Sequence, residues 1–186
     1  VVRLLKNLKG NTIIISKHNT YQNPIDLDQL ETLIFNSIYY DQHEAVILKY
    51  DMESEALFCV FVHSTVRGNA QGGTRFLTYD SFEDIVSDGL RLSRAMTEKN
   101  AVAKIWWGGG KSIICPLKSV QNYSYSKREL LFQNYGRFVA SLNGLYVAAE
   151  DMNTTPQDME TIHTKNRFVT CLPAELGGSS NPSSWT

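Results

Sequence analysis

Residues 81–115 read SFEDIVSDGLRLSRAMTEKNAVAKIWWGGGKSIIC, and this stretch indicates the fold class. Ser81 and Asp84 open it with the spacing of a capping box, which marks the start of a helix. Further on, the apolar run Ile113–Cys115 follows Lys111 and predicts a strand. A helix leading into a strand is typical of an α/β fold. The helix has one apolar face, formed by Phe82, Ile85, Val86, Leu90 and Met96.

The same alternation continues toward the C terminus. A helix is predicted from Ser126, and a strand over residues 145–149 follows it. Another helix is predicted from Thr155, with Pro156 at its first position, where the missing N–H costs nothing. The sequence therefore predicts a single α/β domain in which a mixed sheet is flanked by helices.

The pattern upstream of residue 81 is also mixed. Apolar residues at helical spacing and early acidic residues predict a helix over residues 24–38. Two β-rich runs, 45–50 and 56–63, are separated by a short polar segment and predict a hairpin. A glycine-bearing loop is expected from residue 68 to 75, leading into a strand over 74–78.

Composition excludes several classes of protein. The chain has 186 residues, of which 42% are hydrophobic, and its formal net charge is −1. A balanced charge gives no sequence-wide electrostatic reason to expect nucleic acid or an anionic membrane as a partner. No stretch approaches the roughly 18–20 apolar residues of a membrane-spanning helix. The four histidines lack metal-ligand spacing, so no metal site is predicted.

Cysteine usage suggests a compartment. Cys59, Cys115 and Cys171 are odd in number and lie beside apolar residues, which is typical of free thiols in a reducing environment. We therefore expect a cytoplasmic protein, with the mitochondrial matrix as the alternative.

The segment Gly108–Lys111 invites a phosphate-loop interpretation, but Ile105 occupies the position where that motif needs its first glycine. Three consecutive glycines still allow a backbone or ligand to approach closely. Lys111 leads into an apolar strand, where partial burial would lower its pKa, as a lysine general base requires.

Two further charged residues are candidates. Lys99 lies at the end of the helix that starts at Ser81, and Asp151 follows the strand 145–149. A solvated helix C terminus explains Lys99 equally well, because cations are favourable there. A plain turn explains Asp151. Spacing alone leaves both readings open.

A longer set of motifs resembles the substrate-binding domain of the leucine/phenylalanine/valine/glutamate dehydrogenase family, the NAD(P)-dependent amino-acid dehydrogenases. The resemblance runs from about Glu44 to Thr186. Its motifs are AQGGTR (70–75), DGLRLSRAMTEKNA (88–101), GGGK (108–111), GRF (136–138), LNG (142–144), AEDMNTT (149–155) and LGGS (176–179).

The resemblance implies roles for single residues. Lys99 would hold the amino-acid carboxylate, Lys111 would activate a water molecule, and Asp151 would exchange protons with the substrate amine. The two lysines are expected to lie close enough to lower each other's pKa. The positions implied to line the substrate are Gln71, Gly72, Gly73 and Ala149, and those implied to face the nicotinamide of NAD or NADP are Thr170 and Thr186.

Several positions depart from the family pattern. Gln71 replaces a usual Leu or Met, and a buried amide there would need a hydrogen-bonding partner, which puts an apolar substrate in doubt. Lys104 and Asn153 each replace a usual glycine, and Asn69 replaces a usual proline. Trp106–Trp107 replaces a smaller pair, for which burial at a subunit contact is favoured over a place at the pocket mouth.

We expect an N-terminal arm (1–22), a substrate-binding and dimerisation domain (23–176), and the start of a linker (177–186) to a Rossmann domain absent from this chain. The resemblance implies the substrate-binding domain of an oligomeric enzyme that oxidatively deaminates an L-amino acid to a 2-oxo acid and ammonia. The alternatives are a non-catalytic subunit of a larger, possibly organellar, assembly and an amino-acid-binding sensor.

Overall fold

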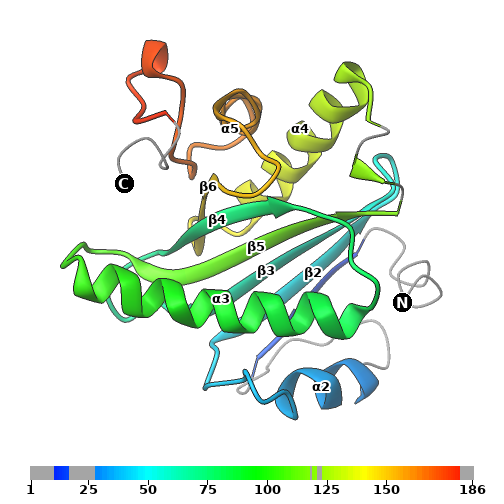
Figure 1. Cartoon of the computed structure of the whole chain (residues 1–186), viewed down its shortest axis with the longest axis vertical. Coiled ribbons are helices and arrows are strands. Elements are labelled where there is room, and N and C mark those ends of the chain that lie inside the picture. The colour runs from blue at the N-terminus through cyan, green and yellow to red at the C-terminus, as the bar shows by residue number, and fades with distance from the viewer. Residues whose placement is uncertain (1–10, 17–27, 118, 121–122, 181–186) are drawn as a thin grey trace.

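The computed structural model describes residues 11–16, 28–117, 119–120 and 123–180, which form one six-stranded sheet with helices on both faces (Figure 1). The predicted α/β class and mixed, helix-flanked sheet are confirmed. The strands are β1 (Thr12–Ile15), β2 (Ala45–Asp51), β3 (Ala56–Ser64), β4 (Ala70–Phe76), β5 (Gly108–Pro116) and β6 (Tyr146–Glu150). The helices are α2 (Asp28–Phe35), α3 (Phe82–Val102), α4 (Tyr125–Ser141) and α5 (Pro156–His163), with a 3-10 turn, η2, at Ala174–Leu176.

The strand order is β1-β2-β3-β5-β4-β6. β1, β2, β3 and β5 pair antiparallel, whereas β4 is parallel to both β5 and β6. Parallel neighbours need crossover connections, and α3 provides the one between β4 and β5. All described strands belong to this one sheet, and the described residues contain no separate dinucleotide-binding domain. Within the expected N-terminal arm, residues 12–15 are the edge strand β1.

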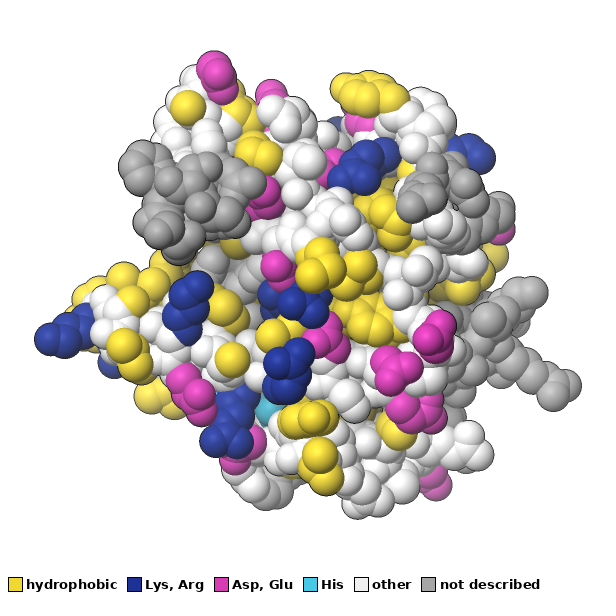
Figure 2. Space-filling model, viewed as in Figure 1, with side chains coloured by type: hydrophobic (Ala, Val, Ile, Leu, Met, Phe, Trp, Pro, Cys, Tyr) yellow, Lys and Arg dark blue, Asp and Glu magenta, His cyan; other side chains and the backbone are white. Residues whose placement is uncertain are grey.

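Each face of the sheet has its own apolar core. The helices α2 and α3 cover one face, where Phe61, Leu90 and Ile113 are fully buried. α4 and α5 cover the other, where Phe58 and Tyr135 belong to the second core. Acidic and basic side chains are intermixed across the face seen in Figure 2. No helix of the described residues has the length and hydropathy to cross a membrane.

The starts of α3 and α5 were predicted correctly from their caps, whereas α4 begins at Tyr125, one residue before the predicted Ser126, and its N-cap residue Ser124 makes no capping hydrogen bond. The Ser81 hydroxyl accepts a hydrogen bond from the Asp84 N–H, and Thr155 and Asp158 form the second capping box. The hairpin of β2 and β3 is also confirmed.

Two predicted elements need correction. In the described residues, the helix predicted over 24–38 ends at Phe35, and Ile38 is 89% exposed instead of facing the core. The poor helix formers Asn36 and Ser37 end it in a turn.

The second correction concerns the glycine-bearing loop. Strand β4 already begins at Ala70, so Gly72 and Gly73 lie inside the sheet. A Cβ on Gly72 would come within 1.8 Å of the Gly110 carbonyl oxygen. These glycines therefore serve close approach between neighbouring segments, which the sequence pattern of a loop does not distinguish.

Candidate active site

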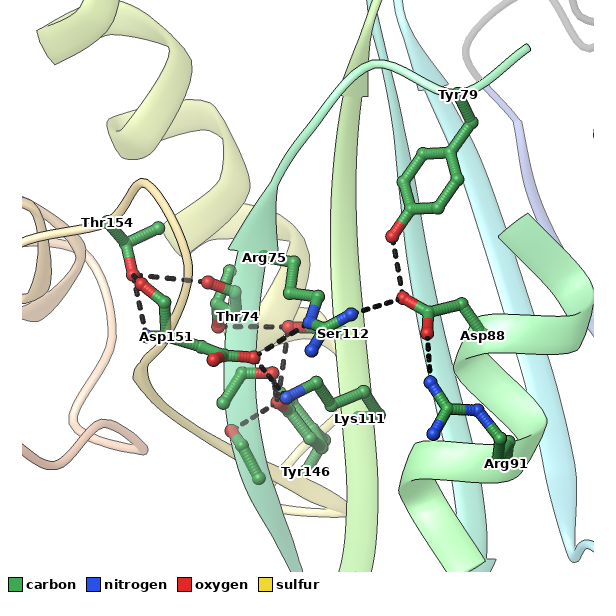
Figure 3. Close-up of polar contacts among 12 residues, drawn as sticks. Thr74, Arg75, Tyr79, Asp88, Arg91, Lys111, Ser112, Tyr146, Asp151 and Thr154 are labelled. Atoms are coloured by element: carbon green, nitrogen blue, oxygen red, sulfur yellow. Dashed lines mark hydrogen bonds and ion pairs between the residues drawn. The ribbon is translucent and has the colours of Figure 1, made fainter. Parts of the chain in front are cut away.

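Lys111 and Asp151 form an ion pair on the sheet face that α3 covers (Figure 3). Lys111 comes from β5 and Asp151 follows β6, so β4 lies between their strands. The Lys111 ammonium donates to Asp151 Oδ2, and the Lys111 side chain is only 7% exposed. The sequence analysis named both residues, and the fold brings them together.

Arg75 of β4 is a second cation on the same carboxylate. Its Nε donates to Asp151 Oδ2 at 3.1 Å, and its guanidinium also donates to Asp88 Oδ2 at 2.6 Å. Asp88 belongs to α3, so Arg75 joins the helix to the end of β6 (Figure 3). Sequence analysis did not single out Arg75. Its place in the AQGGTR motif was the available signal.

The pKa values of both Lys111 and Asp151 are shifted from their usual values. Burial lowers the pKa of Lys111 and outweighs the opposing effect of Asp151, while the positive charge of Arg75 lowers it further. Burial alone would raise the pKa of Asp151, but Lys111 and then Arg75 bring it below its usual value. The site therefore holds an ionised carboxylate beside an amine that loses its proton more readily than an ordinary lysine.

The floor of the site is built from small residues. In the sheet register Gly73 pairs with Ala149, and Gln71 pairs with Val147 and Gly109. Alternation along β4 places Gln71 and Gly73 on the same face as Arg75, and Gly72 faces the other way. The Gln71 amide makes no hydrogen bond with any described residue.

A buried hydroxyl network on the opposite face holds these strands in register. Ser112 donates to Thr74 at 2.9 Å, and Tyr135 donates to Ser112 at 2.7 Å. The Tyr146 hydroxyl donates to the Gly72 carbonyl at 2.5 Å. Burial raises the pKa of Tyr135 to about 12, so this network stays neutral and supports the strands beneath Lys111. Sequence analysis missed it, because its members come from three strands and a helix that only the fold brings together.

Lys99 is not a member of the ion pair. It is exposed near the C-terminal end of α3, and its ammonium makes no hydrogen bond or ion pair with the described residues. Burial and the charge of Arg75 lower the pKa of Lys111, and an effect of Lys99 on Lys111 stays a prediction.

Of the two positions that the resemblance implies to face the nicotinamide, the structure describes one. Thr170 lies beside β6, where its hydroxyl donates to the Ala148 carbonyl at 3.2 Å. Thr186 lies outside the described residues.

The structure shows the backbone conformation or the exposure of three residues that depart from the family pattern. Lys104 has φ 57° and Asn153 has φ 60°, a left-handed backbone conformation that favours glycine. Trp106 is 82% exposed in the single chain, and the Arg67 guanidinium lies 5.7 Å from its ring centroid, so burial at a subunit contact stays a prediction.

Comparison with known proteins adds independent information. A family model described as Glu/Leu/Phe/Val dehydrogenase, dimerisation domain, matches residues 53–167. A leucine dehydrogenase of Thermoactinomyces intermedius is 40% identical over 150 residues, which cover 81% of this chain and 40% of the relative. The chain thus spans about 40% of the length of the curated relatives it matches.

Solved structures agree with this similarity. The L-tryptophan dehydrogenase of Nostoc punctiforme superimposes with a TM-score of 0.63 at 39% identity, over 69% of this chain and 36% of that chain. The hetero-hexameric glutamate dehydrogenase of Thermus thermophilus, solved in its Leu-bound form, has a TM-score of 0.59 at 19% identity, over 87% of this chain and 45% of that chain. The latter similarity concerns the fold alone.

Proposed function

The chain belongs to the Glu/Leu/Phe/Val dehydrogenase family, and we propose that it is the substrate-binding and oligomerisation domain of an NAD(P)-dependent amino-acid dehydrogenase. The reaction would be oxidative deamination of an L-amino acid to a 2-oxo acid and ammonia. The observation that carries this proposal is the buried Lys111–Asp151 ion pair on a floor of glycine and alanine.

The residues of this chain suit the hydrolytic half of that reaction. Once the substrate is an imino acid, water adds to its α-carbon and Lys111 in its neutral form takes the water proton. The Asp151 carboxylate exchanges protons with the substrate nitrogen, which leaves as ammonia while the carbonyl of the 2-oxo acid forms. The low pKa of Lys111 favours the neutral amine that this step needs.

The redox half needs a nicotinamide cofactor, which would accept the hydride from the substrate α-carbon. The described residues do not fit a dinucleotide, because Gly108–Lys111 form the first four residues of strand β5 instead of a turn that opens a helix. NAD or NADP would therefore be held chiefly by a further domain. Thr170 is the described residue of this chain that would face the nicotinamide.

Lys99 and Gln71 are proposed to contact the substrate. The Lys99 ammonium is uncommitted and can bind a carboxylate that enters beside α3. The Gln71 amide is also unpartnered, and it would hydrogen-bond a polar substrate side chain. We therefore propose a substrate with a polar side chain, in contrast to the leucine and tryptophan in the names of the relatives.

We further propose that the protein works as a homo-oligomer in the cytoplasm. The matched model is named for a dimerisation domain, and the exposed Trp106 offers apolar surface for a subunit contact. Cys59, Cys115 and Cys171 are free thiols, which is consistent with a reducing compartment.

The test uses the complete gene product, purified with any companion chain. We expect amino-acid-dependent reduction of NAD or NADP, and we expect Lys111→Ala to lower kcat by about 1,000-fold or more. Calorimetric binding of an amino acid without turnover would support the sensor alternative. Neither binding nor turnover across the twenty amino acids would support a non-catalytic subunit.

A further inference from the structure

We propose that Arg75 is a positioning residue for the Lys111–Asp151 pair, and that Asp88 of α3 fixes the Arg75 guanidinium in place. This inference rests on the proposed function, since it concerns the same site. The Arg75 guanidinium donates to Asp151 and to Asp88, so it would act through Asp151.

The contacts of Asp151 show what Arg75 does. Both Lys111 and Arg75 donate to Oδ2, whereas Oδ1 receives no hydrogen bond from the described residues. Two cations on one oxygen orient the carboxylate and leave the other oxygen available to the substrate nitrogen. Oδ1 is therefore the atom that would exchange the proton.

Asp88 provides a fixed anchor for Arg75. Its Oδ2 accepts from Arg75 at 2.6 Å and from the Tyr79 hydroxyl at 2.8 Å, and its Oδ1 accepts from Arg91 at 2.9 Å. The Asp88 side chain is only 14% exposed, so these hydrogen bonds are little weakened by solvent. The guanidinium thus has a defined position before any substrate arrives.

Only arginine suits this geometry. The planar guanidinium spans two carboxylates that belong to different elements, one after β6 and one on α3. A lysine ammonium at position 75 would keep the positive charge but not the two directed contacts. Gly73, two residues earlier on the same face, leaves the space in which Asp151 reaches Arg75.

Arg75 also affects the proton affinity of both partners in the same direction. Its hydrogen bond and charge lower the pKa of Asp151, and its charge lowers the pKa of Lys111. Removal of the charge would therefore raise both pKa values. A residue with a merely structural role would change the amount of folded enzyme without moving these ionisations.

The experiment compares Arg75→Met and Arg75→Lys in the complete gene product, with kcat/KM measured against pH. For Arg75→Met we expect at least a tenfold loss at the wild-type optimum and a rising limb displaced to higher pH, because Lys111 then loses its proton later. Arg75→Lys should keep the position of the limb but not the full rate. Arg94→Met, an exposed arginine elsewhere on α3, serves as the control and should match wild type.

A second readout does not depend on turnover. The pH dependence of Lys111 acetylation by acetic anhydride, followed by peptide mass spectrometry, should move to higher pH in Arg75→Met. An active wild type whose Arg75→Met variant keeps both profiles in place would overturn the inference. An inactive wild type in which the acetylation profile still moves would refute the proposed function and retain the positioning role.

Discussion

Gly73 lies directly against Asp151: a Cβ at position 73 would come within 2.6 Å of the Asp151 Cβ and 3.1 Å of its Oδ2. The backbone of β4 thus has no room for a side chain where the carboxylate reaches toward Lys111 and Arg75. The absence of a side chain is as much a part of this site as the charged groups around it.

Gly73→Ala should therefore displace the Asp151 side chain. We expect kcat to fall by about tenfold or more, because a displaced carboxylate no longer meets Lys111 in the same geometry. Steady-state kinetics of the complete gene product would measure this. Gly177→Ala is the matched control, since a Cβ there contacts nothing within 4 Å, although its φ of 76° makes the change a mild strain. Equal losses of kcat in the two variants would contradict the prediction.

Gln71→Leu should change substrate preference. Its amide finds no partner among the described residues, and burial of that amide against an apolar substrate side chain would cost about 1–3 kcal/mol. We expect kcat/KM for leucine to rise about tenfold relative to that for glutamine or glutamate. A panel of amino acids assayed with both proteins measures the ratio. A uniform fall for every amino acid would argue against contact between Gln71 and the substrate side chain.

Lys104→Gly should stabilise the protein. Lys104 has a φ of 57° and is exposed, so its side chain gains little to offset the strain of the left-handed conformation. Glycine relieves that strain, but it also gives the unfolded chain more conformational entropy. The strain is the larger effect, so the free energy of unfolding should rise by about 0.5–1 kcal/mol. Urea unfolding measures the difference. Lys104→Ala keeps the Cβ and should show no comparable gain, and an equal gain in both would indicate loss of charge as the cause.

His43 should make the protein acid-sensitive. It is 2% exposed, and burial lowers its pKa from 6.5 to about 4. Between these two values the unfolded chain binds a proton that the folded chain does not, so stability falls as pH falls through this window. Between pH 7.5 and pH 5 the free energy of unfolding of the wild type should therefore fall by about 2 kcal/mol because of His43. The His43→Gln variant should lack this part of the fall.

Unfolding in urea at the two pH values provides this measurement. The exposed His163 is the control residue, and His163→Gln should keep the wild-type acid sensitivity. Parallel pH dependences of the His43→Gln variant and wild type would rule out His43 as the cause.

Local signals in the sequence predicted much of the fold. The helix starts at Ser81 and Thr155 were recognised because capping boxes act over four consecutive residues. The low pKa of Lys111 was anticipated for the right main reason, burial in an apolar strand. The glycines of β4 were misread as a loop, because close packing between strands is not a local property.

The partners of the charged residues could not be predicted in the same way. Lys99 and Lys111 are close in sequence, yet the ammonium of Lys99 makes no contact at the pair. Arg75 and Asp151 are 76 residues apart and meet because β4 and β6 are neighbours in the sheet. Strand order decides such contacts, and a single sequence does not reveal that order.

Because of the strand order, the site should form late in folding. β2 and β3 are joined by a short turn and can pair early, but Lys111 and Asp151 flank β4, whose parallel partners lie across long connections. Parallel pairing over long chain separations is slow, because loop-closure entropy is lost before the contacts form. During refolding, activity should therefore recover later than the hairpin. The ion pair can form only after β5, β4 and β6 have paired.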